Sequence, residues 1–303
     1  MPEELRAGII GCDTSHCIAF TKVMNNADDK AHVPGVRVVA AYPSFSEDIP
    51  SSVGRVDGFK KELAEKWDIA IVESIEALLE QVDVVLLESV DGRRHLSELK
   101  PVAEARKPVF IDKPFAASLD DAKKMVELID KHKLPCFSGS SLRFDSNIAA
   151  LAADTKACGK ILGCDAFSPA HLDETNPGLF WYGIHGVEIL YTIMGEGCQS
   201  VQCTSGPDGE LAVGTWKDGR IGTMRGIRKG KGGYGAMVLC ENSPPINKQA
   251  AGDYYGRLVK AIVEFFKTGK PPLPISETLE ICAFIDAALR SSNEQGCDVT
   301  LRL

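Results

Sequence analysis

The first half of the chain alternates short apolar runs with helical segments, and this alternation constrains the fold more than any other feature. Its strand-like runs are apolar or β-branched throughout, as in Val82–Leu87 and Val109–Ile111. Strands of this kind are buried on both faces, which is typical of a parallel sheet covered by helices on both sides. We expect strands at residues 7–10, 36–41, 70–72, 82–87, 109–111 and 135–138. We expect helices at residues 15–25, 59–67, 74–81, 94–106 and 119–132.

The second half has a different pattern, because its strands follow one another with only one helix between them. Asp218-Gly219 is a hairpin signal between two of these strands. The pattern predicts an α+β domain with a mostly antiparallel open sheet, and a doubly wound parallel domain before it. We place the two domains at residues 1–140 and 141–303. The expected elements are strands at 161–167, 200–204, 211–216, 220–228 and 236–240, and helices at 184–194, 254–268 and 275–293.

Composition narrows the class of protein. The length of 303 residues suggests two domains or one large one, and a content of 44% hydrophobic and 25% charged residues is ordinary for a globular protein. A net charge of −8 argues against a general nucleic-acid binder. The acidic start Met1–Glu4 is unlike a secretory signal, and no apolar stretch is long enough for a membrane span. Ten cysteines without a CxxC pair indicate reduced, mostly buried thiols. We therefore expect a cytoplasmic protein without membrane or nucleic-acid partners.

The turn after the first strand resembles a dinucleotide-binding turn in which two of three glycines are replaced. Such turns read G-x-G-x-x-G, and the chain has Gly11-Cys12-Asp13-Thr14-Ser15-His16. Asp13 could repel a pyrophosphate, and the ring of His16 should push the helix away from the strand. Alternatively, the hydroxyls of Thr14 and Ser15 and the helix amides still hold a phosphate. The second strand also ends without the acidic residue that binds the adenine ribose. The sequence leaves both interpretations open.

A lysine and a histidine are the candidate catalytic residues. Lys113 follows the buried run 108–111, at the carboxyl end of a parallel strand, where open α/β sheets bind ligands. Burial there disfavours the charged form of a lysine and suits it to take a proton. The alternative is a lysine that pairs with Asp112. His185 opens an apolar helix, and alone it would be a capping or core histidine. Together, the two suggest a site that handles a proton.

Several segments in the right order resemble the Gfo/Idh/MocA family, the group of glucose–fructose oxidoreductase and inositol dehydrogenase. These are Val84–Glu88 followed by His95, Lys107–Phe115, Leu142–Phe144, Gly183–His185 with Glu188, and the C-terminal segments Gly269–Pro272 and Leu279–Ser291. The resemblance implies a Rossmann domain, NAD or NADP as cofactor, and a sugar, polyol or cyclitol substrate. It also implies a homo-oligomer formed through the sheet of the second domain.

Carried over residue by residue, the resemblance assigns the roles of individual side chains. Lys113 and His185 match the catalytic pair of the family. Trp181 stands where the family usually has an aspartate, four residues before the histidine, which puts the binding of a sugar hydroxyl there in doubt. The candidate cofactor-binding residues, from the turn, the strand ends and the resemblance together, are Gly11, Asp13, Thr14, Ser15, His16, Ser89, His95, Asp112 and Lys113. The candidate substrate-binding residues are Lys113, Arg143, His171, Trp181, Tyr182, His185 and Glu188.

Two other functions remain open on the sequence. The altered turn is compatible with a catalytically silent relative that binds a carbohydrate or a nucleotide. A metal-assisted lyase or isomerase would use His171, His185 and Glu188. The cluster around Cys12 and His16 matches no standard zinc spacing, and we expect no metal site.

Overall fold

The computed structural model describes residues 4–153 and 158–303 and divides into two compact units. Unit 1 comprises the chain up to Ala116, Asp120–Gly139 and Tyr255–Ile275, and unit 2 comprises the remainder. The helix predicted at residues 254–268 therefore lies almost wholly in unit 1, so a single boundary near residue 140 describes this division incompletely. Residues 1–3 of the acidic start lie outside the described residues.

Unit 1 is built on a six-stranded sheet in the order β3-β2-β1-β4-β5-β6. Every pair of neighbouring strands runs parallel, which confirms the predicted doubly wound sheet. Its strands are buried because helices cover both faces, as their apolar sequences require. The strands are β1 Leu5–Ile10, β2 Val36–Tyr42, β3 Ala70–Ile71, β4 Val84–Leu87, β5 Val109–Ile111 and β6 Cys136–Ser138.

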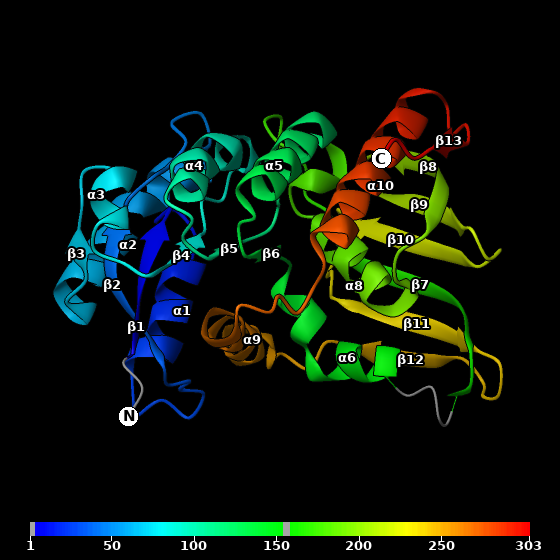
Figure 1. The fold of residues 1–303 in the computed structure, drawn as a ribbon. Coiled ribbons are helices and arrows are strands. Elements are labelled where there is room, and N and C mark those ends of the chain that lie inside the picture. Colours follow the sequence, from blue (N-terminus) through cyan, green and yellow to red (C-terminus); the bar gives the residue numbers. More distant parts are fainter. Residues whose placement is uncertain (1–3, 154–157) are drawn as a thin grey trace. The chain divides into compact units, whose positions relative to one another are not determined.

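The helices of unit 1 lie on both sides of this sheet, with α1 and α9 on one side and α4 and α5 on the other (Figure 1). Ser74 caps α3 as expected, because its hydroxyl accepts a hydrogen bond from the amide of Ala77. Helix α2 begins at Pro50, well before the predicted residue 59, since Gly54 and Gly58 obscure the helical pattern. The helices are α1 His16–Asn25, α2 Pro50–Trp67, α3 Ile75–Leu79, α4 Gly92–Glu104, α5 Leu119–His132 and α9 Tyr254–Thr268.

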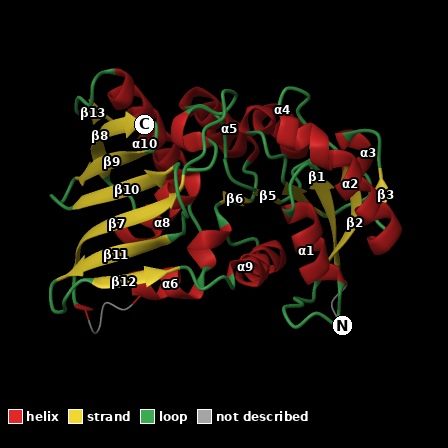
Figure 2. Ribbon diagram, turned by 180° about the vertical axis from the view of Figure 1, so that it is seen from behind, coloured by secondary structure: helices red, strands yellow, loops and turns green. Residues whose placement is uncertain are grey.

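Unit 2 contains a seven-stranded sheet in the order β12-β11-β7-β10-β9-β8-β13. It is mostly antiparallel, as predicted, with β7 and β10 as a parallel pair. Helices α6, α8 and α10 lie on one face, and no described helix covers the other face (Figure 2). The strands are β7 Ile161–Pro169, β8 Cys198–Gly206, β9 Gly209–Trp216, β10 Ile221–Ile227, β11 Gly235–Cys240, β12 Ile246–Gln249 and β13 Val299–Thr300. The helices are η1 Ser141–Phe144, α6 Ser146–Ala153, η2 Gly178–Phe180, α8 Ile184–Met194 and α10 Ile275–Asn293.

Two edge strands and one helix of unit 2 were not predicted. Strand β12 has the sequence Ile-Asn-Lys-Gln, which lacks the apolar alternation of a half-buried strand. Strand β13 is only two residues long. Helix α6 is short and lies in a segment rich in alanine, so it has little periodicity to detect.

The cysteines are mostly buried, as the sequence predicts. All ten cysteines are free thiols, and eight of them are buried. Within residues 4–153 and 158–303, each helix is too short or too polar to cross a membrane.

Gly11 sets the geometry at the end of β1. Its φ is +98°, a conformation that favours glycine, and a Cβ atom there would lie 2.2 Å from the amide nitrogen of Ser89. The chain after β1 can therefore pass directly against the chain after β4, which brings the first turn to the carboxyl ends of the neighbouring strands.

We expect Gly11→Ala to destabilise the protein by about 2 kcal/mol or more, because the backbone would be strained and the methyl group would overlap Ser89. Gly58→Ala is the matched control: it lies in the exposed part of α2 with open space around it, and should stabilise by about 0.5–1 kcal/mol. Urea unfolding of both variants measures this difference. Equal stability of Gly11→Ala and the wild type would contradict the assigned turn.

Candidate functional site

The turn between β1 and α1 is cross-linked to two other loops by Asp13. Its side chain is fully buried and accepts hydrogen bonds from the Ser52 hydroxyl at 2.6 Å and from the Val90 amide at 3.0 Å. Burial raises the pKa of Asp13, against the opposing effect of these two donors. The carboxylate that could have repelled a pyrophosphate is thus bound within the protein. It connects the first turn to α2 and to the loop after β4.

His16 occupies the third glycine position and begins α1. Its Nδ1 lies 2.5 Å from Oδ2 of Asp112, and its Nε2 lies 3.2 Å from the hydroxyl of Tyr255. The ring also stacks on Phe20, with centroids 5.1 Å apart and planes 20° apart. The ring that was expected to separate helix from strand therefore forms a buried bridge to the end of β5 and the start of α9.

Unpartnered polar atoms line the carboxyl ends of β4, β5 and β6. Within the described residues, both carboxyl oxygens of Glu88, Oδ1 of Asp112 and the hydroxyl of Ser138 are buried without a hydrogen-bond partner. Buried polar atoms are nearly always satisfied, so these atoms point to a ligand or water. This edge is also where open parallel sheets bind ligands.

The two carboxyl groups at this edge differ in their pKa. Burial raises the pKa of Glu88 well above its ordinary value, and the charges of Asp112 and Asp13 add to the effect. Burial acts in the same direction on Asp112, but the charge and hydrogen bond of His16, helped by Lys113, hold its pKa below the ordinary value. Glu88 is therefore favoured as a neutral acid beside an ionised Asp112.

Lys113 is half-buried directly after Asp112. Its ammonium group makes no hydrogen bond or ion pair with the described residues, whereas Asp112 is bonded to His16. The alternative was an ion pair between Lys113 and Asp112, and the structure does not show that ion pair. Nearby, both ring nitrogens of buried His95 face carbonyl oxygens, that of Ser89 at 2.7 Å and that of Phe115 at 3.2 Å. His95 thus ties the loop after β4 to the segment that follows Lys113.

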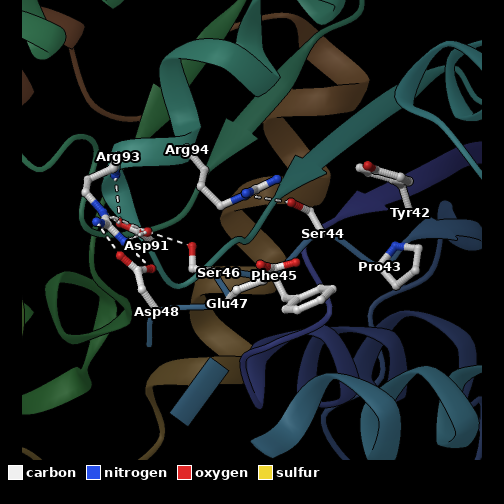
Figure 3. A pocket seen from close by; sticks show the side chains of 10 residues that line it. All are labelled: Tyr42, Pro43, Ser44, Phe45, Ser46, Glu47, Asp48, Asp91, Arg93 and Arg94. Carbon is white, nitrogen blue, oxygen red and sulfur yellow. Dashed lines mark hydrogen bonds and ion pairs between the residues drawn. The ribbon is translucent and has the colours of Figure 1, made fainter. Parts of the chain in front are cut away.

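A pocket of about 660 Å³ lies beyond the end of β2 (Figure 3). Arg93 forms ion pairs with Asp48 and Asp91 across it, while Arg94 contacts Ser44 (Figure 3). This is the part of a dinucleotide fold that receives the adenosine half of the cofactor. This pocket was not predicted from the sequence, because its residues come from a loop without a motif and from the start of α4. The pocket is lined by Tyr42, Pro43, Ser44, Phe45, Ser46, Glu47, Asp48, Asp91, Arg93 and Arg94.

In unit 2, His185 lies in the first turn of α8 within a group of aromatic rings. Its Nδ1 is 2.7 Å from the Ser140 hydroxyl, and its ring lies 5.5 Å from Tyr182 and 5.6 Å from Tyr234. His171 continues the group, with its ring 5.4 Å from that of Tyr182. Trp181 is half-buried beside them in the chain. Tyr234 was not predicted, although it directly follows the glycine-rich segment 229–233.

Two residues predicted to bind substrate are instead bound to each other. Arg143 and Glu188 form an ion pair of 2.9 Å with little exposure, and Arg143 also pairs with Glu277. Burial raises the pKa of Glu188 in spite of Arg143. This network joins η1, α8 and α10 and holds the guanidinium of Arg143 within unit 2.

The sequence left open a metal site formed by His171, His185 and Glu188. Among residues 4–153 and 158–303, no three side chains of His, Cys, Asp or Glu are arranged to hold a metal ion. His171, His185 and Glu188 therefore do not form a metal-ligand set there.

The fold, with polar residues at the carboxyl ends of the parallel strands of unit 1, defines a two-unit α/β protein whose first unit is of the Rossmann type. Comparison with known proteins agrees with this fold class. A model of the oxidoreductase family with an NAD-binding Rossmann fold, GFO_IDH_MocA, matches residues 5–140. This part of the chain is therefore similar to the NAD-binding Rossmann unit of the Gfo/Idh/MocA oxidoreductases. The resemblance drawn from the sequence is confirmed, as is NAD as the cofactor of the family.

Individual relatives are more distant. A curated myo-inositol 2-dehydrogenase of Thermotoga maritima is 29% identical over 178 residues, which are 52% of this chain and 53% of that protein. The match thus spans about half the length of the relative. The myo-inositol dehydrogenase of Lactobacillus casei, solved with NAD(H) and myo-inositol, has a TM-score of 0.76 at 18% identity over 99% and 98% of the chains. An oxidoreductase from Agrobacterium radiobacter, solved with NAD+, L-tartaric acid and magnesium, has a TM-score of 0.75 at 17% identity over 98% of each chain. These two structures support the fold.

The raised pKa of Glu88 predicts how the stability of the protein changes with pH. The unfolded chain ionises Glu88 near its ordinary pKa, whereas the folded protein keeps its proton to a higher pH. The unfolded state then binds fewer protons, so stability should fall as pH rises from about 4.5 towards the raised pKa, by about 1.4 kcal/mol per pH unit. We expect Glu88→Gln to remove this loss and to be more stable than wild type at pH 8.

Urea unfolding between pH 4 and 8 measures this effect. Glu104→Gln is the control, because Glu104 is exposed at the end of α4. This variant should leave the pH profile of stability unchanged. A Glu88→Gln variant with the wild-type slope would show that Glu88 does not hold a proton in the folded state.

Proposed function

We propose that this protein is an oxidoreductase that transfers hydride between NAD(P) and a sugar, polyol or cyclitol derivative. The observation that carries the proposal is the sheet edge of unit 1, where Lys113, without a described ion-pair partner, follows buried carboxyl oxygens of Glu88 and Asp112 that have no hydrogen-bond partner. The family of residues 5–140 and the myo-inositol 2-dehydrogenase relative support the reaction class.

The residues of unit 1 fit a dinucleotide. Ribose hydroxyls are donors that match the free acceptor atom of the ionised Asp112, and a carboxamide, which both donates and accepts, matches the protonated carboxyl group of Glu88. The pocket beyond β2 offers room for the adenosine half, and Thr14 and Ser15 at the start of α1 offer donors for a phosphate. The bound nicotinamide would supply hydride transfer, while the protein supplies position and charge.

The chain's own residues would handle the proton and the substrate. As a neutral amine, Lys113 takes the hydroxyl proton during oxidation and becomes an ammonium, and no described side chain is bonded to its Nζ. We propose that His185, held by Ser140 in unit 2, binds a substrate hydroxyl. The rings of Tyr182 and Tyr234 offer an apolar platform for the C–H face of a sugar ring.

A silent binding protein is the second candidate, and one observation favours it. Asp13 and His16 tie the first turn into side-chain hydrogen bonds where a dinucleotide turn normally has bare glycines. A protein of this kind would bind its ligand without turnover.

We also propose a homo-oligomer formed through the uncovered face of the unit 2 sheet. Apolar side chains are exposed on this face, including Ile221 at 54% and Leu239 at 39%. Exposed apolar patches of this kind mark protein interfaces. The free thiols fit the cytoplasmic location that we expect.

Lys113→Ala should lower turnover by at least about 10²-fold, because the proton would lose its acceptor. Reduction of NAD+ or NADP+ with myo-inositol and a panel of cyclitols and sugars measures turnover by nicotinamide absorbance. NADH or NADPH fluorescence measures cofactor binding, which should persist in the variant. Lys100→Ala is the control, since Lys100 is exposed on α4.

Full activity of Lys113→Ala would remove this lysine from the mechanism. If the wild type binds neither NADH nor NADPH at millimolar concentration, the oxidoreductase proposal fails. Cofactor binding without turnover on any substrate tested would favour the silent relative.

Ile221→Asp should lower the oligomeric state, because a buried charge in the proposed interface would be desolvated. Sedimentation velocity of the wild type and the variant tests this expectation. Val53→Asp, on an exposed apolar residue of α2 in unit 1, is the control and should keep the wild-type state. A monomeric wild type, or an unchanged Ile221→Asp variant, would contradict the proposed interface.

A further inference from the structure

We propose that His16 is a positioning residue for Asp112 and that this pair replaces the third glycine in organising the cofactor site. In this arrangement His16 holds one oxygen of Asp112 so that the other oxygen is presented to a ribose hydroxyl of the dinucleotide. The inference rests on the proposed function, because it assigns a chain-specific part of the same site.

The ring of His16 is fixed from three directions. Nδ1 faces Oδ2 of Asp112 at 2.5 Å, and Nε2 faces the hydroxyl of Tyr255 at 3.2 Å. One face of the ring stacks on Phe20 at 5.1 Å, and the ring of Tyr255 meets it edge-on at the same distance. A side chain held in this way has little freedom to rotate. It can therefore define the orientation of a group bonded to it, as outer partners of ligand-binding groups commonly do.

Asp112 has one oxygen occupied and one oxygen open. Oδ2 accepts from the ring of His16, while Oδ1 is buried without a partner in the described part of the chain. With Oδ2 anchored, the direction of Oδ1 is fixed by the planar carboxylate. An ionised carboxylate only accepts hydrogen bonds, so its complement is a donor such as a hydroxyl. Glu88, which also lacks partners, lies on the neighbouring strand end and extends the same surface.

The hydrogen bond also connects two segments that act on the cofactor. His16 is the first residue of α1, directly after the turn 11–15, and Asp112 directly precedes Lys113. A glycine at position 16 has no side chain and could not make this connection. The structure therefore links the orientation of the lysine segment to that of the turn, through one buried pair with 8% and 3% side-chain exposure.

Four variants separate this role from a merely steric one. His16→Gly restores the glycine of the dinucleotide turn and removes the ring. His16→Phe keeps a ring that can stack on Phe20 but cannot bond to Asp112. His16→Asn keeps a donor near the place of Nδ1, and Asp112→Asn keeps the shape of Asp112 without its charge. The probe is NADH, titrated by its fluorescence, and thermal unfolding verifies that each variant is folded at the temperature used.

We expect NADH to bind about tenfold more weakly, or worse, to His16→Gly and His16→Phe, since each loses a charge-assisted hydrogen bond. His16→Asn should recover part of the affinity, which a purely structural loss would not allow. Asp112→Asn should weaken binding, and its combination with His16→Phe should cost less than the sum of the two. In the wild type, NADH should also shift the NMR signal of the His16 Nδ1 nitrogen.

Tighter or unchanged NADH binding by His16→Gly would overturn the inference, because the ring would then be an obstacle or irrelevant. Wild-type affinity of His16→Phe for NADH would also overturn the inference, since packing of the ring alone would then be enough for binding. In both cases the wild type still binds NADH and the proposed function stands. Absence of NADH binding by the folded wild type would instead overturn both the inference and the proposed use of NADH.

Discussion

The hydrogen bond between His16 and Asp112 is the interaction on which the account of this site depends. It lies at the carboxyl edge of the parallel sheet, where the chain after β1 meets the chain after β5. Burying a carboxylate is costly unless a partner supports its charge, and His16 provides that partner. The lysine beside Asp112 has no ion-pair partner among the described residues. The contact between His16 and Asp112 thus orders the edge at which Lys113 is available.

The remaining cross-links show how the altered turn is accommodated. Where a dinucleotide turn uses glycines for close approach, this chain uses Asp13 to bind Ser52 and the Val90 amide. Gly11 alone keeps the close approach, because the amide of Ser89 leaves no space for a side chain. Carboxyl oxygens of Glu88 and Asp112 remain without hydrogen-bond partners at the same edge. The edge is therefore held by hydrogen bonds between its own loops, and the polar atoms without partners lie where a ligand would bind.

Much of the fold could be predicted from the sequence, because buried parallel strands and amphipathic helices leave clear periodicities. Helices α8, α9 and α10 begin and end at the predicted residues. Polar or very short edge strands such as β12 left no such pattern. The sequence also singled out Lys113, Asp112 and His16 as site candidates. It could not show that His16 bonds to Asp112, since 96 residues separate them and only the fold brings them together. For the same reason, the pairing of Arg143 with Glu188 was not foreseen.

A crystal structure of the protein with NADH bound would test the central claim most directly. The account predicts the nicotinamide ribose within hydrogen-bond distance of Oδ1 of Asp112, with the bond between Asp112 and His16 intact and Lys113 beside the nicotinamide ring. A dinucleotide bound away from the ends of β4 and β5, or a His16 ring released from Asp112 in the complex, would contradict it.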